Sequence, residues 1–292
     1  MENQGQLTSG LLYLVATPIG NLGDMGFRAV EILKAVAVIA CEDTRHSRPL
    51  LDHYGIDRPL LALHEHNEDR VSARLVERML DGEPVALISD AGSPLINDPG
   101  FPLVHQARAA GIRVSPIPGP CALIAALSAS GLSSHRFAFE GFPPRKSQAR
   151  RNWLESLRSE TRTLIFYESS HRIEETLRDV TAVFPASRRL AIARELTKRF
   201  ETVVATTVGE SVSLLTAHPE MRLGEFVVLI EGEEDRSESE QLTPSQLHTL
   251  RVLLEEHSVK KAVELTTKIS GARRELVYRE ALRWSESRGD WR

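Results

Sequence analysis

The chain has 292 residues, of which 41% are hydrophobic and 26% are charged, and its formal net charge is -4. This composition is typical of a soluble globular protein with length for two domains of ordinary size. No uninterrupted apolar stretch reaches the roughly 20 residues that span a bilayer, which argues against a transmembrane helix. Residues 1–10 lack the basic and apolar regions of a signal peptide. Cys41 and Cys121 both lie in apolar runs and are expected to be reduced, so we predict a cytoplasmic protein.

The first 130 residues alternate short apolar runs with helical patterns. Strands are predicted at residues 11–16, 36–40, 85–89 and 112–116. Helices are predicted at residues 27–36, 47–54, 68–80, 99–110 and 122–130. This alternation indicates parallel βαβ units with right-handed crossovers. We therefore predict an N-terminal α/β domain over residues 10–132.

A second cycle begins at Phe137, which places the predicted domain boundary near residues 131–135. Strands are predicted at residues 137–142, 163–167, 190–194, 202–206 and 226–231. Helices are predicted at residues 148–158, 173–184 and 208–216. These elements predict a second α/β domain over residues 136–232.

Residues 233–241 hold five acids and one arginine, which predicts a solvated acidic linker. After it, Thr243 and Pro244 have the pattern of an N-cap followed by proline at the first helical position. Helices are predicted at residues 245–256, 259–268 and 272–284, within a helical module over residues 242–292. The apolar spacing on both sides of Gly271 resembles a helix-turn-helix. A lid of three short helices is the alternative.

Four predicted strands of the first domain end in loops rich in proline, glycine or polar residues, at residues 17–21, 42–45, 89–94 and 116–121. If the strands are parallel neighbours, these loops meet at one edge of the sheet, where open α/β sheets bind ligands. Any one such loop is also explained as a strand end. Asp90 offers an acceptor for ribose hydroxyls or an amine, and the chain has no GxGxxG or GxxxxGK[ST] motif for phosphates.

Seven strings follow one another along residues 10–232: VATPIGNLGD, CEDTRHS, LISDAGSPLINDPG, PIPGPCALIAALSASGL, FAFEGFPPRK, LIFYESSHR and ARELTKRFE. In this order they resemble the ribosomal RNA small-subunit methyltransferase I family, a branch of the tetrapyrrole-methylase superfamily. The last three helices resemble the terminal helical module of that family. The resemblance implies a mostly parallel first sheet, a mixed second sheet and a homodimer.

The resemblance also implies S-adenosylmethionine as cofactor, in a cleft between the two α/β domains. The expected cofactor-binding residues are Pro18, Gly20, Asp90, Ala91, Gly92, Ser93, Gly119, Pro120, Cys121, Ala122, Tyr167, Ala193, Gly224 and Glu225. The glycines are expected to let the backbone approach this bulky ligand closely. The implied substrate is the ribose 2′-hydroxyl of a cytidine in the decoding region of 16S rRNA, within the small ribosomal subunit.

Methyl transfer to a hydroxyl requires in-line positioning and removal of a weakly acidic proton. Glu168 and His171 are our candidates for the proton acceptor, and Lys198 and Arg194 for phosphate-binding or acidifying cations. The alternative is an ion-pair network, in which Glu168 pairs with Arg172 and Arg194 with Glu195.

Two further clusters combine acidic and basic side chains. Asp43 with Arg45 is a further acid–base pair, and His64 and His66 have the spacing that places both on one face of a strand. No third ligand is evident beside the two histidines, so no metal site is predicted.

Cations gather at two places that suit RNA. Arg145, Lys146, Arg150 and Arg151 follow the strand that holds Phe139 and Phe142, and Arg273 and Arg274 begin the last helix. An extruded nucleotide is held by stacking and phosphate contacts, although a charge run also forms an ordinary solvated face.

We therefore predict an rRNA 2′-O-ribose methyltransferase that uses S-adenosylmethionine. The rivals are a methyltransferase of the same superfamily that acts on a tetrapyrrole or another small molecule, and a non-catalytic RNA-binding or regulatory protein. The basic loop at residues 145–151 and the basic terminal helices argue against the first rival, because a small macrocycle does not need them. The intact cofactor loops argue against the second.

Overall fold

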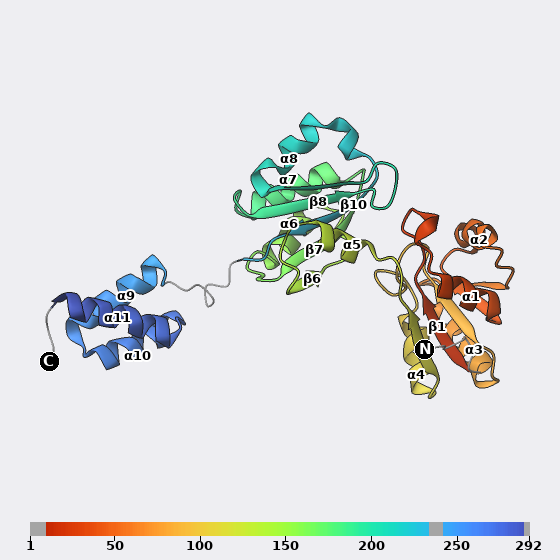
Figure 1. The fold of residues 1–292 in the computed structure, drawn as a ribbon, viewed down its shortest axis with the longest axis horizontal. Helices are drawn as coiled ribbons and strands as arrows, with labels where there is room; N and C mark the ends of the chain where they lie inside the picture. Colours follow the sequence, from red (N-terminus) through yellow and green to blue (C-terminus); the bar gives the residue numbers. More distant parts are fainter. Residues whose placement is uncertain (1–9, 234–241, 289–292) are drawn as a thin grey trace. The chain divides into compact units, whose positions relative to one another are not determined.

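The structure is a computed structural model that describes residues 10–233 and 242–288 (Figure 1). The chain divides into two compact units. The first contains the residues up to Arg158 together with Arg162–Glu231, and the second contains Ser159–Thr161 with the residues from Gly232 onward. Most of the predicted acidic linker, residues 234–241, lies outside the described residues.

The first unit contains a five-stranded sheet with the strand order β3-β2-β4-β1-β5. Its strands are β1 (Leu11–Val15), β2 (Val38–Cys41), β3 (Leu60–Ala62), β4 (Val85–Ile88) and β5 (Arg113–Ile117). All the pairings are parallel, and Val15 at the end of β1 lies opposite Ile88 and Ile117. The predicted parallel sheet is therefore confirmed.

Helices cover both faces of this sheet because alternate side chains of each strand point to opposite faces. Tyr13 of β1 belongs to the core beneath α1 and α2, whereas its neighbour Leu12 belongs to the core beneath α3 and α4. The helices are α1 (Phe27–Ala35), α2 (Thr44–His53), α3 (Glu68–Leu80) and α4 (Phe101–Ala109), with a 3-10 turn η1 (Leu22–Asp24) after β1.

A second five-stranded sheet has the order β6-β7-β10-β8-β9. Its strands are β6 (Phe137–Phe139), β7 (Thr163–Ser169), β8 (Arg189–Arg194), β9 (Thr202–Thr207) and β10 (Glu225–Ile230). Only the β6–β7 pairing is parallel, so this sheet is mixed, as the family resemblance implies.

The helices of the second sheet are α5 (Ala122–Ala129), α6 (Ser147–Ser156), α7 (Ile173–Val183) and α8 (Val208–Ala217), with a 3-10 turn η2 (Pro219–Arg222). The last three cover one face of the sheet, and α5 covers the other. Leu123 and Leu127 of α5 pack against Ile165 and Val227. Although α5 precedes the predicted boundary at residues 131–135, it thus contributes to the core of the second sheet.

The second unit contains α9 (Pro244–Glu256), α10 (Val259–Ser270) and α11 (Arg274–Arg288). Thr243 caps α9, and its hydroxyl and the Gln246 side chain form a capping box, which confirms the predicted start of this helix. Gly271 ends α10 with a φ of +66°, a conformation that glycine adopts at little cost. Leu250, Ala262 and Val277 form the centre of a small separate core.

Several elements differ from the predictions, and three of these differences have a local physical cause. The short edge strand β3 was not predicted, because three residues carry too little periodicity. Strand β6 ends at Phe139 rather than Phe142, since Gly141 turns the chain with a φ of +68° and Pro143 follows. Helix α2 begins at Thr44 rather than Ser47, because the Asp43 carboxylate accepts a hydrogen bond from the Arg45 N–H at 2.7 Å and caps it. No helix in residues 10–233 and 242–288 is long and apolar enough to cross a membrane.

Candidate functional site

The predicted loops follow β1, β2, β4 and β5, and they lie at one edge of the first sheet because these strands are parallel. Backbone hydrogen bonds join Thr17 to Gly92, at 2.9 and 3.1 Å. The Ser93 hydroxyl donates to the Pro120 carbonyl at 3.2 Å. Three of the four loops are therefore bonded to one another, which confirms that they converge.

A cavity of about 320 Å³ opens beside these loops. One side, which we call the first wall, is formed by Ile19, Ala91, Gly92, Ser93, Ile96, Asn97, Asp98, Cys121 and Ala122. The other side, the second wall, is formed by Phe142, Tyr167, Glu168, Ser169, Leu196, Glu225, Phe226 and Val227. The lining thus combines apolar side chains with a few carboxylates and hydroxyls, as small-molecule sites do.

Seven of the predicted cofactor-binding residues line this cavity: Ala91, Gly92, Ser93, Cys121, Ala122, Tyr167 and Glu225. The other seven do not: Pro18, Gly20, Asp90, Gly119, Pro120, Ala193 and Gly224. Sequence reasoning gave Asp98 no role and named Phe142 only as a neighbour of the predicted RNA-binding cations, although both lie in strings that carry the family resemblance. Asp98 could have been found as an acidic residue in a loop with two prolines. Phe142 could have been found as an aromatic residue directly before Pro143.

Two predicted glycines, Gly20 and Gly119, have a role in the packing of loops. A Cβ at Gly119 would lie 2.9 Å from the Cβ of Ala16, and a Cβ at Gly20 would lie 2.5 Å from the Cγ of Lys198. Gly20 also has a φ of +146°. The expected close approach of backbone to cofactor is therefore not needed to explain these glycines.

Backbone strain is concentrated at the cavity. In the described part of the chain, the non-glycine residues with positive φ are Leu95, Asn97, Glu195 and Thr197. They flank two lining residues, Ile96 on the first wall and Leu196 on the second. Such conformations are costly for L-residues and cluster at functional sites.

Two carboxylates of the first wall and its edge have buried oxygens without a hydrogen-bond partner in residues 10–233 and 242–284: Oδ1 of Asp90 and Oδ2 of Asp98. Burial, followed by the nearby Glu42 and Asp90 carboxylates, raises the pKa of the Asp98 carboxyl to about 6, although a hydrogen bond with the Ser89 side chain opposes the rise. Burial also raises the pKa of the Glu42 carboxyl, with a contribution from Asp90. Buried polar atoms are normally hydrogen-bonded, so these two oxygens are exceptions that the described residues leave unsatisfied.

Tyr167 connects the two walls through its hydroxyl, which accepts a hydrogen bond from the Leu123 N–H at 3.3 Å. Burial, followed by the nearby Cys121 thiol, raises the pKa of this hydroxyl to about 12. The ring lies 4.7 Å from that of Phe139 and 5.7 Å from that of Phe142, between ring centroids. Tyr167 is thus a protonated, apolar part of the cavity lining.

The predicted proton acceptor Glu168 is already engaged. Its carboxylate accepts hydrogen bonds from the Thr176 hydroxyl at 2.6 Å and the Ser169 N–H at 2.8 Å, and it lies 3.3 Å from the Arg172 guanidinium. Its side chain is fully buried and points towards α7, because neighbouring residues of a strand face opposite sides and Tyr167 faces α5. His171 is exposed and does not line the cavity. The structure therefore contains the Glu168–Arg172 ion pair of the alternative interpretation.

The predicted cations Lys198 and Arg194 are also engaged. The Lys198 ammonium donates to Glu195 at 2.9 Å and to Glu225 at 2.8 Å. Burial lowers the pKa of Lys198, but these two hydrogen bonds outweigh it and leave the pKa raised. The buried Arg194 guanidinium donates to the backbone carbonyls of Leu223 and Phe200. Glu195 consequently pairs with Lys198, rather than with Arg194 as the network alternative expected.

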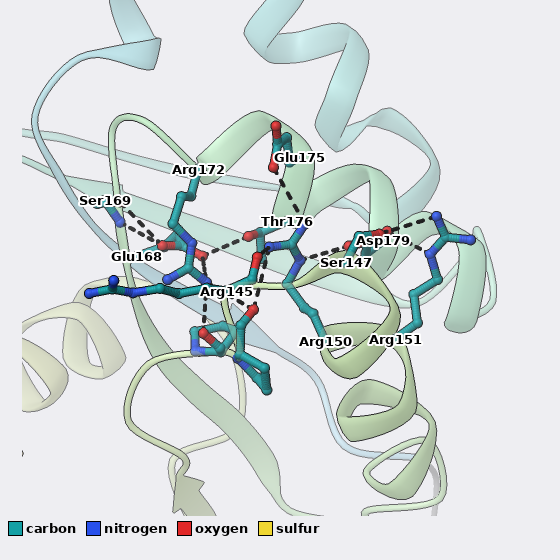
Figure 2. Close-up of polar contacts among 12 residues, drawn as sticks. Arg145, Ser147, Arg150, Arg151, Glu168, Ser169, Arg172, Glu175, Thr176 and Asp179 are labelled. Carbon is teal, nitrogen blue, oxygen red and sulfur yellow. Dashed lines mark hydrogen bonds and ion pairs between the residues drawn. The ribbon is translucent and has the colours of Figure 1, made fainter.

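The four predicted RNA-binding cations of residues 145–151 fall into two groups, of which Arg150 and Arg151 pair with Asp179 (Figure 2). Arg150 is buried and donates to Asp179 at 2.7 Å, and Arg151 donates to the same carboxylate at 2.8 Å. Arg145 and Lys146 are exposed, and within residues 10–233 and 242–284 their side chains form no hydrogen bond or ion pair. The prediction that Arg150 binds RNA is therefore wrong, since its guanidinium is enclosed within the fold.

The remaining polar clusters have structural explanations. Asp43 caps α2, and the rings of His64 and His66 lie 5.9 Å apart in an edge-on arrangement in the turn after β3. Among the described residues, no group of three or more His, Cys, Asp or Glu side chains is arranged to hold a metal ion.

Comparison with known proteins gives the family. The family of Tetrapyrrole (Corrin/Porphyrin) Methylases matches residues 11–211. The protein named ribosomal RNA small subunit methyltransferase I in Xylella fastidiosa is 52% identical over 272 residues, which cover 93% of this chain and 98% of that protein. Its namesake in Pseudomonas aeruginosa is 50% identical over 94% of this chain and 98% of its own length. The chain belongs to the ribosomal RNA small subunit methyltransferase I family.

The helical module also matches a family model, since residues 240–285 match the RsmI C-terminal HTH domain. Solved structures show the fold. A cobalt precorrin-4 methyltransferase is 15% identical with a TM-score of 0.54, over 78% of this chain and 98% of the other. A uroporphyrin-III-C-methyltransferase from Thermus thermophilus is 21% identical with a TM-score of 0.53, over 76% and 94%. At these identities, the two solved structures show only that this chain shares their fold.

In this family member, Arg273 and Arg274 are exposed at the start of α11, with no ion pair in the part of the chain that the structure describes. Lys261 and Lys268 on α10 both pair with Glu264, at 3.2 and 2.8 Å. The module thus presents unpaired arginines at the junction of its last two helices.

Proposed function

We propose that this protein methylates the ribose 2′-hydroxyl of a cytidine in the decoding region of 16S rRNA, with S-adenosylmethionine as methyl donor. We further propose that it acts on the small ribosomal subunit in the cytoplasm, as a homodimer. The observation that carries the proposal is the cavity, which is lined by the Asp98 carboxylate on its first wall and by apolar side chains such as Leu196, Phe226 and Val227 on its second. Relatives of almost the same length carry the corresponding name.

The residues of the cavity fit S-adenosylmethionine. This cofactor has cationic, apolar and hydroxyl-bearing parts, and it carries no phosphate. The Asp98 carboxylate in the lining, with Asp90 at the edge of the first wall, offers acceptors for an ammonium group or ribose hydroxyls, whereas Ile19, Ile96 and Val227 offer apolar surface to an adenine ring. When bound, the cofactor supplies a methyl group activated by a sulfonium.

The chain itself must position the hydroxyl and receive its proton. We propose Asp98 for the proton, in place of Glu168 and His171. Asp98 lines the cavity, and its Oδ2 has no partner in residues 10–233 and 242–284. The carboxylate of Glu168, in contrast, already accepts from Thr176 and Ser169. An acceptor with a pKa near the working pH combines a large ionised fraction with adequate basicity.

The exposed cations beside the cavity favour RNA over a small macrocycle as the substrate. Arg145 and Lys146 follow the lining residue Phe142, and they remain exposed and unpaired in the described residues. Arg273 and Arg274 add two such cations on the helical module. Phosphate contacts of this kind supply much of the affinity of proteins for nucleic acids.

Two measurements test the proposal. Isothermal titration calorimetry should show S-adenosylmethionine binding to the wild-type protein and loss of binding in a folded Asp90→Ala variant. Mass spectrometry of 16S rRNA from cells without the protein should show one ribose methyl group missing from a decoding-region cytidine, restored by the wild-type gene. An unchanged modification profile would instead favour a small-molecule substrate, and absence of cofactor binding would exclude the enzyme.

A further inference from the structure

The loop at residues 142–146 is held by two arginines, Arg172 and Arg150, whose guanidinium groups donate to its backbone carbonyls (Figure 2). The Arg172 guanidinium donates to the carbonyls of Pro143 at 2.7 Å and Pro144 at 3.2 Å. The Arg150 guanidinium donates to the carbonyls of Pro144 at 3.5 Å and Arg145 at 3.3 Å. Three consecutive carbonyls are thereby fixed, and the two proline rings restrict the backbone further.

Each of these arginines is in turn anchored by a buried carboxylate. Glu168, whose side chain is fully buried, lies 3.3 Å from Arg172, and Asp179, with 5% of its side chain exposed, lies 2.7 Å from Arg150. Thr176 donates to Glu168 and Ser147 donates to Asp179, so further lone pairs of both carboxylates are satisfied. The loop is therefore held in one conformation before any ligand arrives.

This scaffold leaves three side chains of the loop outside it. Phe142 lines the cavity and yet keeps 49% of its surface exposed, with its ring edge-on to Tyr167. Arg145 and Lys146 extend into solvent without an ion pair in the described part of the chain. A half-exposed aromatic ring beside a cavity has the properties of a base-stacking surface, and exposed cations without an ion-pair partner are suited to phosphate contacts.

We propose that Phe142, Arg145 and Lys146 form a subsite for one extruded nucleotide of single-stranded RNA. The ring of Phe142 stacks on the base, and Arg145 and Lys146 bind the flanking phosphates. Glu168 and Asp179 are positioning residues that act through Arg172 and Arg150. The subsite rests on the proposed function, because it delivers the ribose to the cavity where the methyl group is transferred.

Equilibrium binding of a fluorescent single-stranded RNA with the decoding-region sequence tests the stacking surface directly. Phe142→Ala should weaken binding about tenfold or more, the range expected when a base-stacking aromatic is removed, and Phe142→Trp should restore it. Phe137→Ala is the matched control, since Phe137 is 39% exposed but does not line the cavity. Equal affinity of Phe142→Ala and Phe137→Ala for the RNA would overturn the stacking role.

The salt dependence of the same binding tests the phosphate contacts. Arg145→Ala and Lys146→Ala should each reduce the slope of log K against log salt by about 0.7. Arg158→Ala, which removes an exposed cation paired with Glu155, should leave the slope unchanged. Unchanged slopes in both loop variants would overturn the phosphate contacts.

The positioning role is tested by Arg172→Lys, which keeps the charge and loses the two-carbonyl grip. This variant should bind RNA several-fold more weakly while its affinity for S-adenosylmethionine, measured by calorimetry, stays at the wild-type value. An equal loss of affinity for RNA and for S-adenosylmethionine would show that Arg172 affects the stability of the whole protein, and it would overturn the positioning role. RNA binding is read without methyl transfer, so a wild-type protein that binds this RNA but no cofactor would refute the proposed function and leave the subsite standing.

Discussion

The two walls of the cavity differ in how their charged groups are used. On and beside the first wall, Asp90 and Asp98 have buried oxygens with no partner in the described residues. On the second wall and behind it, the carboxylates of Glu168, Glu195 and Glu225 are paired with Arg172 or Lys198. The carboxylates of the first wall and its edge are therefore candidates for ligand contact, whereas those of the second wall and behind it stabilise the local loops. The presence of acidic or basic residues at a strand end does not by itself indicate whether they contact a ligand or form ion pairs within the fold.

The largest expected effect concerns Asp98 on the first wall. Asp98→Asn should lower kcat about 100-fold or more, as loss of a general base does. In the wild-type protein, kcat should fall as the pH decreases through about 6, where this carboxyl becomes protonated, and in the variant this dependence should disappear. Initial rates of methyl transfer to unmethylated small subunits between pH 5 and 8 measure both.

The same substitution has an opposite expected effect on stability. The folded state raises the pKa of Asp98 above its unfolded value, so the folded protein loses stability as the pH rises through this range. At pH 7, Asp98→Asn should therefore raise Tm, and the gain should shrink towards pH 4. A variant that is inactive and also less stable at pH 7 would indicate misfolding rather than loss of a proton acceptor.

The paired carboxylates of the second α/β domain should contribute to stability, and Asp179 tests this. Asp179→Ala leaves the buried Arg150 guanidinium without its carboxylate and should cost about 3–5 kcal/mol in the free energy of unfolding. The hydrogen bonds from Arg150, Arg151 and Ser147 outweigh burial and lower the pKa of Asp179, so this contribution is lost as the pH falls below about 4. Urea unfolding at pH 7 measures the loss. Glu155→Ala, which breaks an exposed pair with Arg158, is the control and should cost less than about 1 kcal/mol.

A substitution at Gly119 tests whether this glycine is needed for packing against Ala16 or for contact with a ligand. Gly119→Ala places a Cβ against Ala16 and should cost about 1–3 kcal/mol in unfolding free energy. Ala16→Gly removes the opposing methyl group, so the cost in the double variant should be less than the sum of the two single costs. Strictly additive costs, combined with weaker cofactor binding, would return Gly119 to the ligand-contact role that the sequence suggested.

The smallest expected effect concerns Lys198 behind the second wall. Lys198→Met removes the partner of Glu195 and Glu225 and should cost about 1 kcal/mol or less, because the ammonium is partly exposed and its pairs are screened by solvent. The pKa of Lys198 is raised in the folded state, so the difference from wild type should persist up to about pH 10 and shrink above it. Thermal unfolding across that range checks the sign. A loss of several kcal/mol would show that this pair contributes as much as the buried Arg150–Asp179 pair.

Local sequence patterns predicted most of the fold. Apolar runs interrupted by glycine and proline located nine of the ten strands, and helical spacing with caps such as Thr243 located the helices. These features depend on neighbours within a few residues, which the sequence displays directly. The three-residue strand β3 and the early end of β6 at Phe139 depend on a partner strand and on one turn, so they were missed or misplaced.

The site was predictable only as far as its loops. The sequence by itself determined that polar loops follow parallel strands, and therefore that Ala91, Ser93 and Cys121 lie at one sheet edge. The tertiary structure alone decided which charges are neutralised: Glu168 by Arg172, and Arg150 by Asp179, 29 residues away in the chain. The reason is physical, since the cost of burying a charge depends on its spatial neighbours. Composition and order along the chain do not record whether a carboxylate has a partner.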